Sequence, residues 1–205
     1  MESPELEPST AGLEYTNRLN RLGSKRWKQW LNVQAPYRWN IRRVLSGRTL
    51  DVGCGTGRVL SALSPESLGV DHNPHSVQFC RDQGLTAYTV DDFFADKSLS
   101  APESFDSLIA AHLVEHLEPA DARDILASYL PMLRPGGTVL LITPQERGYA
   151  SDATHVTFTD FAKLDHLTTD LGLEKVRHFS FPFPRVVGKV FLYNEFNHVS
   201  RQPLA

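Results

Sequence analysis

The sequence has 205 residues, of which 41% are hydrophobic and 22% charged, and its formal net charge at pH 7 is −3. These values are ordinary for a soluble globular protein with a substantial core. Only two cysteines occur, and no stretch approaches the roughly 20 apolar residues that span a bilayer, which excludes a disulfide scaffold and a membrane span. We therefore expect a soluble, cytoplasmic protein.

The first 48 residues are expected to precede the α/β core. Residues 1–14 are acidic, contain prolines and lack an apolar segment, which indicates a disordered tail and not a signal peptide. Residues 15–48 are predicted to form a helical cap, because leucines and aromatic residues recur at helical spacing before Pro36 and a second helix-like run follows it. This cap carries nine basic residues and no acid: Arg18, Arg21, Lys25, Arg26, Lys28, Arg38, Arg42, Arg43 and Arg48. A solvated helical face explains that charge, and a surface for an anionic ligand or a nucleic acid is the alternative.

From residue 49 onward, strand-like and helix-like runs alternate. The strand-like runs cover residues 49–53, 67–72, 86–91, 105–113 and 137–144, and the helix-like runs cover 58–63, 74–83 and 119–133. Such alternation predicts parallel strands, because each crossover helix covers a face of the sheet. Past Pro144, a helix capped by Thr159 and stopped by Gly172 should lead into a hairpin-like pair of strands. We expect a single α/β domain over residues 15–205, with its core at 49–205.

Three glycines alternate in "DVGCGTG", at residues 51–57, directly after the first predicted strand. Glycine loses more conformational freedom on folding than any other residue, so we expect a ligand to approach this backbone so closely that side chains are excluded. The alternative is a tight turn without a ligand. A dinucleotide fingerprint would need glycine where Arg58 stands, which disfavours an oxidoreductase.

Five segments in order, "DVGCGTG", "GVDHN", "TVDDFF", "FDSLIAAHLVEHL" and "LRPGGTVLLITP", resemble the motifs of class I S-adenosylmethionine-dependent methyltransferases over residues 49–144. The resemblance implies a Rossmann-like, doubly wound seven-stranded sheet with six parallel strands and the last antiparallel. It also implies S-adenosylmethionine as cofactor, with Asp71 at the ribose hydroxyls, Asp92 at the adenine amino group and the backbone after it at the ring. The expected cofactor-binding residues are Arg38, Asp51, Gly53, Cys54, Gly55, Gly57, Asp71, His72, Asp92, Phe93 and His112.

Candidate catalytic residues follow the fourth and fifth predicted strands. His112 is expected where the methyl group lies, as a base or substrate contact, with plain packing as the alternative. Asp152 and His155 are expected to act together, either as a general base in which the Asp152 carboxylate orients the His155 imidazole, or as ligands of Mg²⁺. The alternative is that His155 is only a cap or hinge residue. Glu115 and His116 resemble a common turn of the family, and we expect them to be mainly structural. The acceptor pocket is expected to be lined by Trp27, Tyr37, Trp39 and Tyr149.

The predicted function is O-methylation of a small molecule. The expected acceptor is a hydroxyl group of a saccharide, in polysaccharide biosynthesis. Residues 26–40 and 181–196 are similar to segments of small actinobacterial methyltransferases that include a sugar 1-O-methyltransferase of methylmannose polysaccharide synthesis. Alternatives are a phenol, quinone-precursor or carboxylate methyltransferase, an RNA methyltransferase and a non-catalytic nucleotide-binding module. The net charge disfavours nucleic acid, and the sequence leaves a homodimer open.

Overall fold

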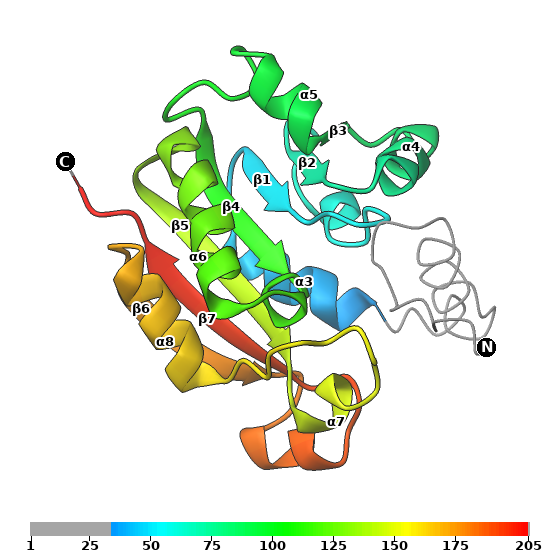
Figure 1. Cartoon of the computed structure of the whole chain (residues 1–205). Coiled ribbons are helices and arrows are strands. Elements are labelled where there is room, and N and C mark those ends of the chain that lie inside the picture. Colours follow the sequence, from blue (N-terminus) through cyan, green and yellow to red (C-terminus); the bar gives the residue numbers. More distant parts are fainter. Residues whose placement is uncertain (1–33, 205) are drawn as a thin grey trace, which may run out of the picture.

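The computed structural model describes residues 34–204, which form a seven-stranded sheet with the strand order β3-β2-β1-β4-β5-β7-β6 (Figure 1). The strands are β1 Thr49–Val52, β2 Leu68–Asp71, β3 Ala87–Thr89, β4 Phe105–Ala111, β5 Leu133–Pro144, β6 Glu174–Phe181 and β7 Glu195–Arg201. β7 runs antiparallel to both of its neighbours, while the neighbouring pairs from β3 to β5 are parallel. The prediction of six parallel strands and an antiparallel last strand is therefore confirmed.

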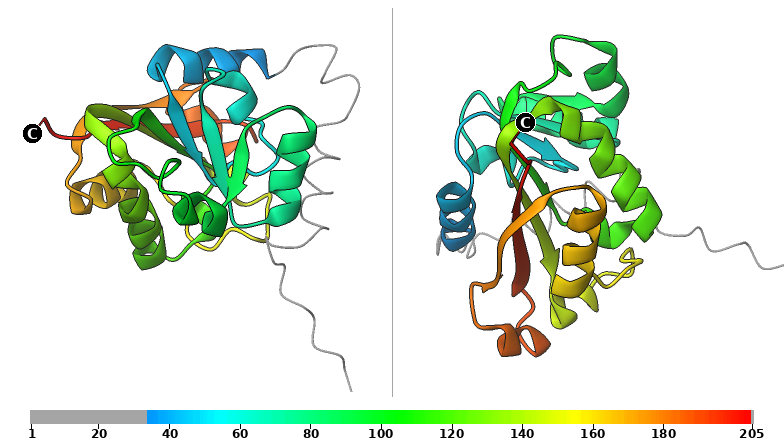
Figure 2. Two further views of the ribbon diagram at one scale, coloured as in Figure 1. Left: turned by 90° about the horizontal axis from the view of Figure 1, so that it is seen from above. Right: turned by 90° about the vertical axis from the view of Figure 1, so that its left-hand side faces the viewer.

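Helices cover both faces of this sheet. They are α3 Ala35–Val44, α4 Pro74–Asp82, α5 Val90–Ala95, α6 Pro119–Tyr129, α7 Glu146–Tyr149 and α8 Phe161–Asp170, with 3₁₀ turns η1 Leu60–Ala62, η2 Val114–His116, η3 Leu130–Met132 and η4 Arg185–Lys189. Figure 2 shows α3 on one side of the sheet and α6 and α8 on the other. Among residues 34–204, no helix is both long enough and apolar enough to cross a membrane.

The strand sequences explain why both faces need helices. Successive side chains of a strand point to opposite faces. Leu108 therefore packs into a core with residues of α5, α6 and α8, whereas its neighbour Ile109 packs into a second core with Ile41 of α3 and with Leu45, which follows that helix. Continuous apolar runs of this kind are what a parallel sheet with two covered faces requires.

Several predicted boundaries are wrong. The helix expected at 58–63 is only the short turn η1, and the helix expected to run to residue 133 ends at Tyr129. Pro131 explains the second difference, because it has no N–H to continue the helical ladder. "LRPGG" therefore begins β5 and does not end a helix.

Two local caps also differ from expectation. The third strand ends at Thr89, whose side chain accepts the N–H of Asp92 at 3.1 Å and begins α5, so Asp92 lies in a helix and not in the strand. The cap of α8 is Asp160, which accepts from the Lys163 N–H at 3.1 Å, and not Thr159. The tail at 1–14 and the cap residues 15–33, Trp27 included, lie outside the described residues.

Candidate active site

The glycine loop turns back from the end of β1 onto β2. Gly53, Gly55 and Gly57 all have positive φ, at +74°, +52° and +77°, a region that side-chain-bearing residues rarely adopt. A Cβ at Gly53 would lie 2.9 Å from the Leu113 side chain, and one at Gly57 would lie 2.5 Å from that of Leu85. Backbone conformation and internal packing therefore account for these two glycines, and the close approach of a ligand to the loop stays a prediction.

Asp71, the last residue of β2, fixes this loop. Its Oδ2 accepts the N–H of Gly55 at 2.8 Å, and its Oδ1 accepts the N–H of Asn73 at 2.8 Å. A carboxylate offers about four lone-pair positions, so two remain for further donors. His72 is exposed, and its Nδ1 lies 3.5 Å from Asp71 Oδ1. The loop and the β2 carboxylate thus form one hydrogen-bonded unit at the carboxyl edge of the sheet.

Asp51, in β1, is a buried acid beneath this unit. Its side chain is buried, and Oδ2 has no hydrogen-bond partner within the described residues. Burial first, and then the nearby Asp71 carboxylate, raise its pKa from 3.8 to about 7. An unpartnered carboxyl oxygen beside two acceptor positions on Asp71 suits a ligand that brings a cationic group and hydroxyl groups, as S-adenosylmethionine does.

The expected adenine site is only partly accessible. The Asp92 side chain is 61% exposed and lies 3.9 Å from the Arg81 guanidinium. Phe93 is fully buried against Phe94 and Tyr129, so its ring belongs to the core. Cys54 is buried as well. Of these predicted cofactor contacts, Asp92 is the side chain that solvent reaches.

His112 follows β4 and joins two carboxylates. Its Nδ1 lies 3.1 Å from Glu115 Oε1, and its Nε2 lies 3.0 Å from Glu195 Oε1. Burial lowers the pKa of His112, but the two carboxylates outweigh it and raise the pKa to about 9. Both ring nitrogens face a carboxylate oxygen, an arrangement that favours the doubly protonated ring, and a catalytic role of His112 stays a prediction. Sequence reasoning missed Glu195, although an acid inside the buried run "NEFNHVS" was a signal.

The predicted pairing of Asp152 with His155 is replaced by other contacts. Asp152 Oδ1 accepts from the N–H of Thr154 at 3.0 Å and from its hydroxyl at 2.8 Å. His155 Nδ1 lies 2.7 Å from the carbonyl oxygen of Tyr149, whose ring stacks on the imidazole with centroids 5.1 Å apart. A carbonyl oxygen only accepts, so Nδ1 donates and a neutral His155 keeps its lone pair on Nε2.

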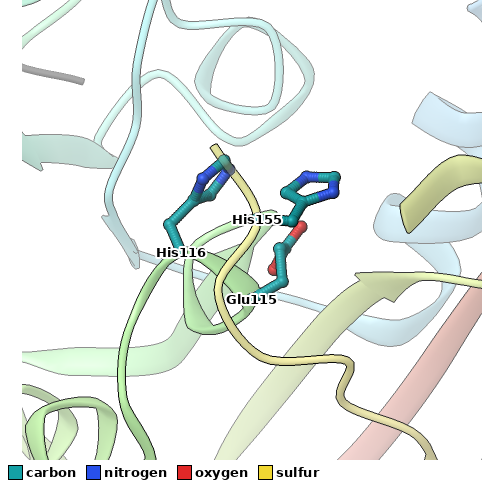
Figure 3. A group of neighbouring side chains, drawn as sticks. All are labelled: Glu115, His116 and His155. Atoms are coloured by element: carbon teal, nitrogen blue, oxygen red, sulfur yellow. The ribbon is translucent and has the colours of Figure 1, made fainter. Parts of the chain in front are cut away.

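Glu115 and His116 come together with His155, which sequence reasoning did not foresee. Their potential ligand atoms all lie within 4.8 Å of one another. Figure 3 shows the three side chains where the loop carrying His155 passes the turn that carries Glu115 and His116. Glu115 is buried, and burial lowers the pKa of His116, favouring its neutral form. The spacing of His112, Glu115 and His116 was the available signal, but only the fold supplies the third residue.

The N-terminal candidates lie along α3. The Tyr37 hydroxyl donates to the Tyr193 carbonyl at 2.8 Å, and burial and Glu195 raise the pKa of Tyr37. Trp39 is 58% exposed beneath the Arg43 guanidinium, which also lies over Phe179 of β6. β6 is the edge strand of the sheet opposite β3, so this face of Trp39 and Arg43 lies against that edge. Arg38 is exposed on the same helix.

Comparisons with known proteins agree with this architecture. Residues 50–139 match the sequence profile of a methyltransferase domain. The fold is similar to a SAM-dependent methyltransferase from Archaeoglobus fulgidus, with 20% identity, a TM-score of 0.68, and coverage of 92% of this chain and 99% of that one. It is also similar to a complex of the Haloferax volcanii Trm112 methyltransferase activator with a putative methyltransferase, at 18% identity, TM-score 0.69, and 94% and 96% coverage.

A third similar structure is the magnesium protoporphyrin IX methyltransferase of Synechocystis with bound SAH, at 13% identity, TM-score 0.58, and coverage of 92% of this chain and 98% of that one. No protein of curated function matches the sequence. The profile match thus covers the first strands and helices of the sheet, and the Rossmann-like fold is the one shared with these structures.

Proposed function

We propose that this chain, with its methyltransferase domain at residues 50–139, transfers a methyl group from S-adenosylmethionine to a hydroxyl oxygen of a small molecule, with a saccharide as the acceptor. The observation that carries the cofactor assignment is the unit formed by Asp71 and the glycine loop above the unpartnered Asp51 oxygen. The saccharide rests on the sequence resemblance of residues 26–40 and 181–196, and so does the narrower candidate, a methylmannose precursor.

The chain's own residues bind and orient the cofactor. Asp71 would accept hydrogen bonds from the two ribose hydroxyls while it also accepts the N–H of Gly55. Asp51 would face a cationic part of the ligand. Asp92 is the exposed acid available to the adenine amino group, and Arg38 stays a prediction for the cofactor carboxylate. When bound, the cofactor supplies a methyl group activated by its sulfonium. Holding donor and acceptor in line is the largest contribution such a site makes.

The acceptor side is assigned to the loop after β5. Tyr149 and His155 stack there, and Nε2 of His155 carries the lone pair that both nitrogens of His112 lack. An alcohol must lose its proton to become a nucleophile, and a positioned base contributes about 10²–10⁴-fold. His155 would act on the acceptor hydroxyl through Nε2, either as that base or as a ligand of a cation that holds the oxygen. A cytoplasmic location and a homodimer stay predictions from the sequence.

Calorimetric titration of the full chain with S-adenosylmethionine and with NADH tests the cofactor assignment. We expect S-adenosylmethionine to bind with one site per chain and NADH not to bind. An Asp71→Ala variant should bind S-adenosylmethionine much more weakly, while exposed His166→Ala on α8 should match the parent. Binding of NADH in preference to S-adenosylmethionine would reject the proposal. A screen of labelled-methyl transfer to saccharides, phenols, carboxylic acids and RNA then identifies the acceptor class.

A further inference from the structure

We propose that Glu115, His116 and His155 form a binding site for a divalent transition metal of the zinc class. Their potential ligand atoms all lie within 4.8 Å of one another, and bonds of about 2 Å to a shared ion would draw these atoms slightly closer, to about 4 Å or less. Sequence reasoning put a metal, as Mg²⁺, on Asp152 and His155, but Asp152 is not among the residues that converge. The new assignment rests on three further observations about these side chains.

The first observation is the tautomer of both histidines. His116 Nδ1 lies 3.0 Å from the carbonyl oxygen of Thr154, and His155 Nδ1 lies 2.7 Å from that of Tyr149. Each Nδ1 must donate, so each neutral ring presents an Nε2 lone pair. Metal-binding histidines characteristically donate their other N–H to a carbonyl or carboxylate, which fixes the ring and raises its basicity. Both rings are thus prepared as ligands in the same way.

The second observation is the unpartnered oxygen of Glu115. This carboxylate is 0% exposed, and within the described residues its Oε2 has no hydrogen-bond partner. Its other oxygen is held by His112, which Glu195 holds in turn. A buried carboxylate oxygen without a partner carries a substantial desolvation cost, and a cation bound by Oε2 offsets it. The supporting His112 orients Glu115 as a ligand.

The third observation is that the backbone holds the two ligand-bearing segments together. The carbonyl oxygen of Glu115 accepts the N–H of Val156 at 2.8 Å and that of Thr157 at 3.0 Å. The rings of His116 and His155 have centroids 4.7 Å apart. Backbone hydrogen bonds and ring contacts of the chain itself therefore hold the two ligand-bearing segments side by side. The site is preorganised.

Two imidazoles and one carboxylate are a donor set for zinc and neighbouring transition metals, whereas Mg²⁺ prefers oxygen ligands and retains its waters. Three protein ligands leave at least one coordination position open, as in catalytic zinc sites. Glu115 and His116 follow Leu113, whose side chain abuts the glycine loop at Gly53. We assign the open coordination position to the hydroxyl oxygen of the acceptor, an assignment that rests on the proposed function. A metal bound there would lower the pKa of that hydroxyl, whose proton would pass to solvent water. The oxygen would then take the methyl group as the methyl–sulfonium bond breaks and S-adenosylhomocysteine leaves, with His155 as a ligand and not as a base.

The test is metal binding by the full chain after treatment with a chelator and exchange into metal-free buffer. Zn²⁺ is titrated in competition with a chromophoric chelator, and Co²⁺ is titrated for the visible absorption of a low-coordinate nitrogen–oxygen site. We expect one Zn²⁺ per chain and no binding of Mg²⁺ at the same concentrations. His155→Ala and Glu115→Gln should each weaken Zn²⁺ binding by about 100-fold or more, and His166→Ala should match the parent.

Thermal unfolding and S-adenosylmethionine titration accompany each variant, and His155→Ala decides the outcome if Glu115→Gln does not fold. A parent that binds no stoichiometric Zn²⁺, or a folded His155→Ala variant that binds Zn²⁺ as tightly as the parent, overturns the metal site. If S-adenosylmethionine binds while Zn²⁺ does not, the metal proposal alone fails. If Zn²⁺ binds while S-adenosylmethionine does not, the metal site stands and the proposed function fails.

Discussion

Replacing Asp51 by asparagine should change how the stability of the protein depends on pH. In the folded state the pKa of Asp51 is raised from 3.8 to about 7, because the carboxyl group is buried and faces Asp71. The folded protein therefore holds a proton that the unfolded chain releases near pH 4. Above that pH the parent loses free energy of unfolding at about 1.36 kcal/mol per pH unit until pH 7, a total of about 4 kcal/mol.

The asparagine variant has no such group, so its free energy of unfolding relative to the parent should rise by up to about 4 kcal/mol between pH 4 and pH 8. Urea unfolding of cofactor-free protein at several pH values in this range measures the difference. At low pH the difference in free energy of unfolding between variant and parent includes the cost of burying an amide. Only the change of this difference with pH is therefore predicted. A difference that stays constant from pH 5 to pH 8 would refute the reasoning about Asp51.

Three further predictions concern the loop and the acceptor side. Asp71→Ala removes the acceptor of the Gly55 N–H and the proposed ribose contacts, so S-adenosylmethionine affinity should fall by about 1.5–3 kcal/mol per lost charge-assisted bond, as measured by calorimetry. Gly53→Ala should lower the free energy of unfolding by at least about 1 kcal/mol, because φ is +74° and the Cβ meets Leu113; unfolding midpoints equal to the parent's would be inconsistent with this packing. His155→Ala should lower turnover about 10²-fold or more with nearly unchanged S-adenosylmethionine affinity, and an enzyme with parental turnover would remove His155 from the site.

The sheet was predictable because its determinants are local in sequence. Apolar runs such as residues 105–111 and 137–144 carry the parallel strands, and the helix-like runs between them carry the crossovers. Boundaries were less predictable, since single contacts decide them. The side chain of Thr89 begins a helix inside what looked like a strand, and Pro131 shortens the helix before it.

The candidate site also has parts that were predictable from local sequence and parts that were not. The glycine loop and Asp71 belong to continuous motifs, so they were named correctly as neighbours at one edge. The Asp152–His155 pairing was inferred from closeness in sequence, but a nearer acceptor, the Tyr149 carbonyl, takes the Nδ1 proton. The contact of His112 with Glu195 and the approach of His155 to His116 depend on how the last third of the chain folds back over β4 and β5, which no local pattern encodes.

Transfer of a labelled methyl group from S-adenosylmethionine to a saccharide acceptor tests the central claim most directly. The purified full chain is incubated with methyl-labelled cofactor and a mixture of saccharides, and the product is treated with alkali and, separately, with ribonuclease. We expect label in a small molecule that survives both treatments, because a methyl ether of a hydroxyl group is stable where a methyl ester or methylated RNA is not. Label that alkali releases or ribonuclease solubilises, or no enzyme-dependent transfer to any acceptor, would contradict it.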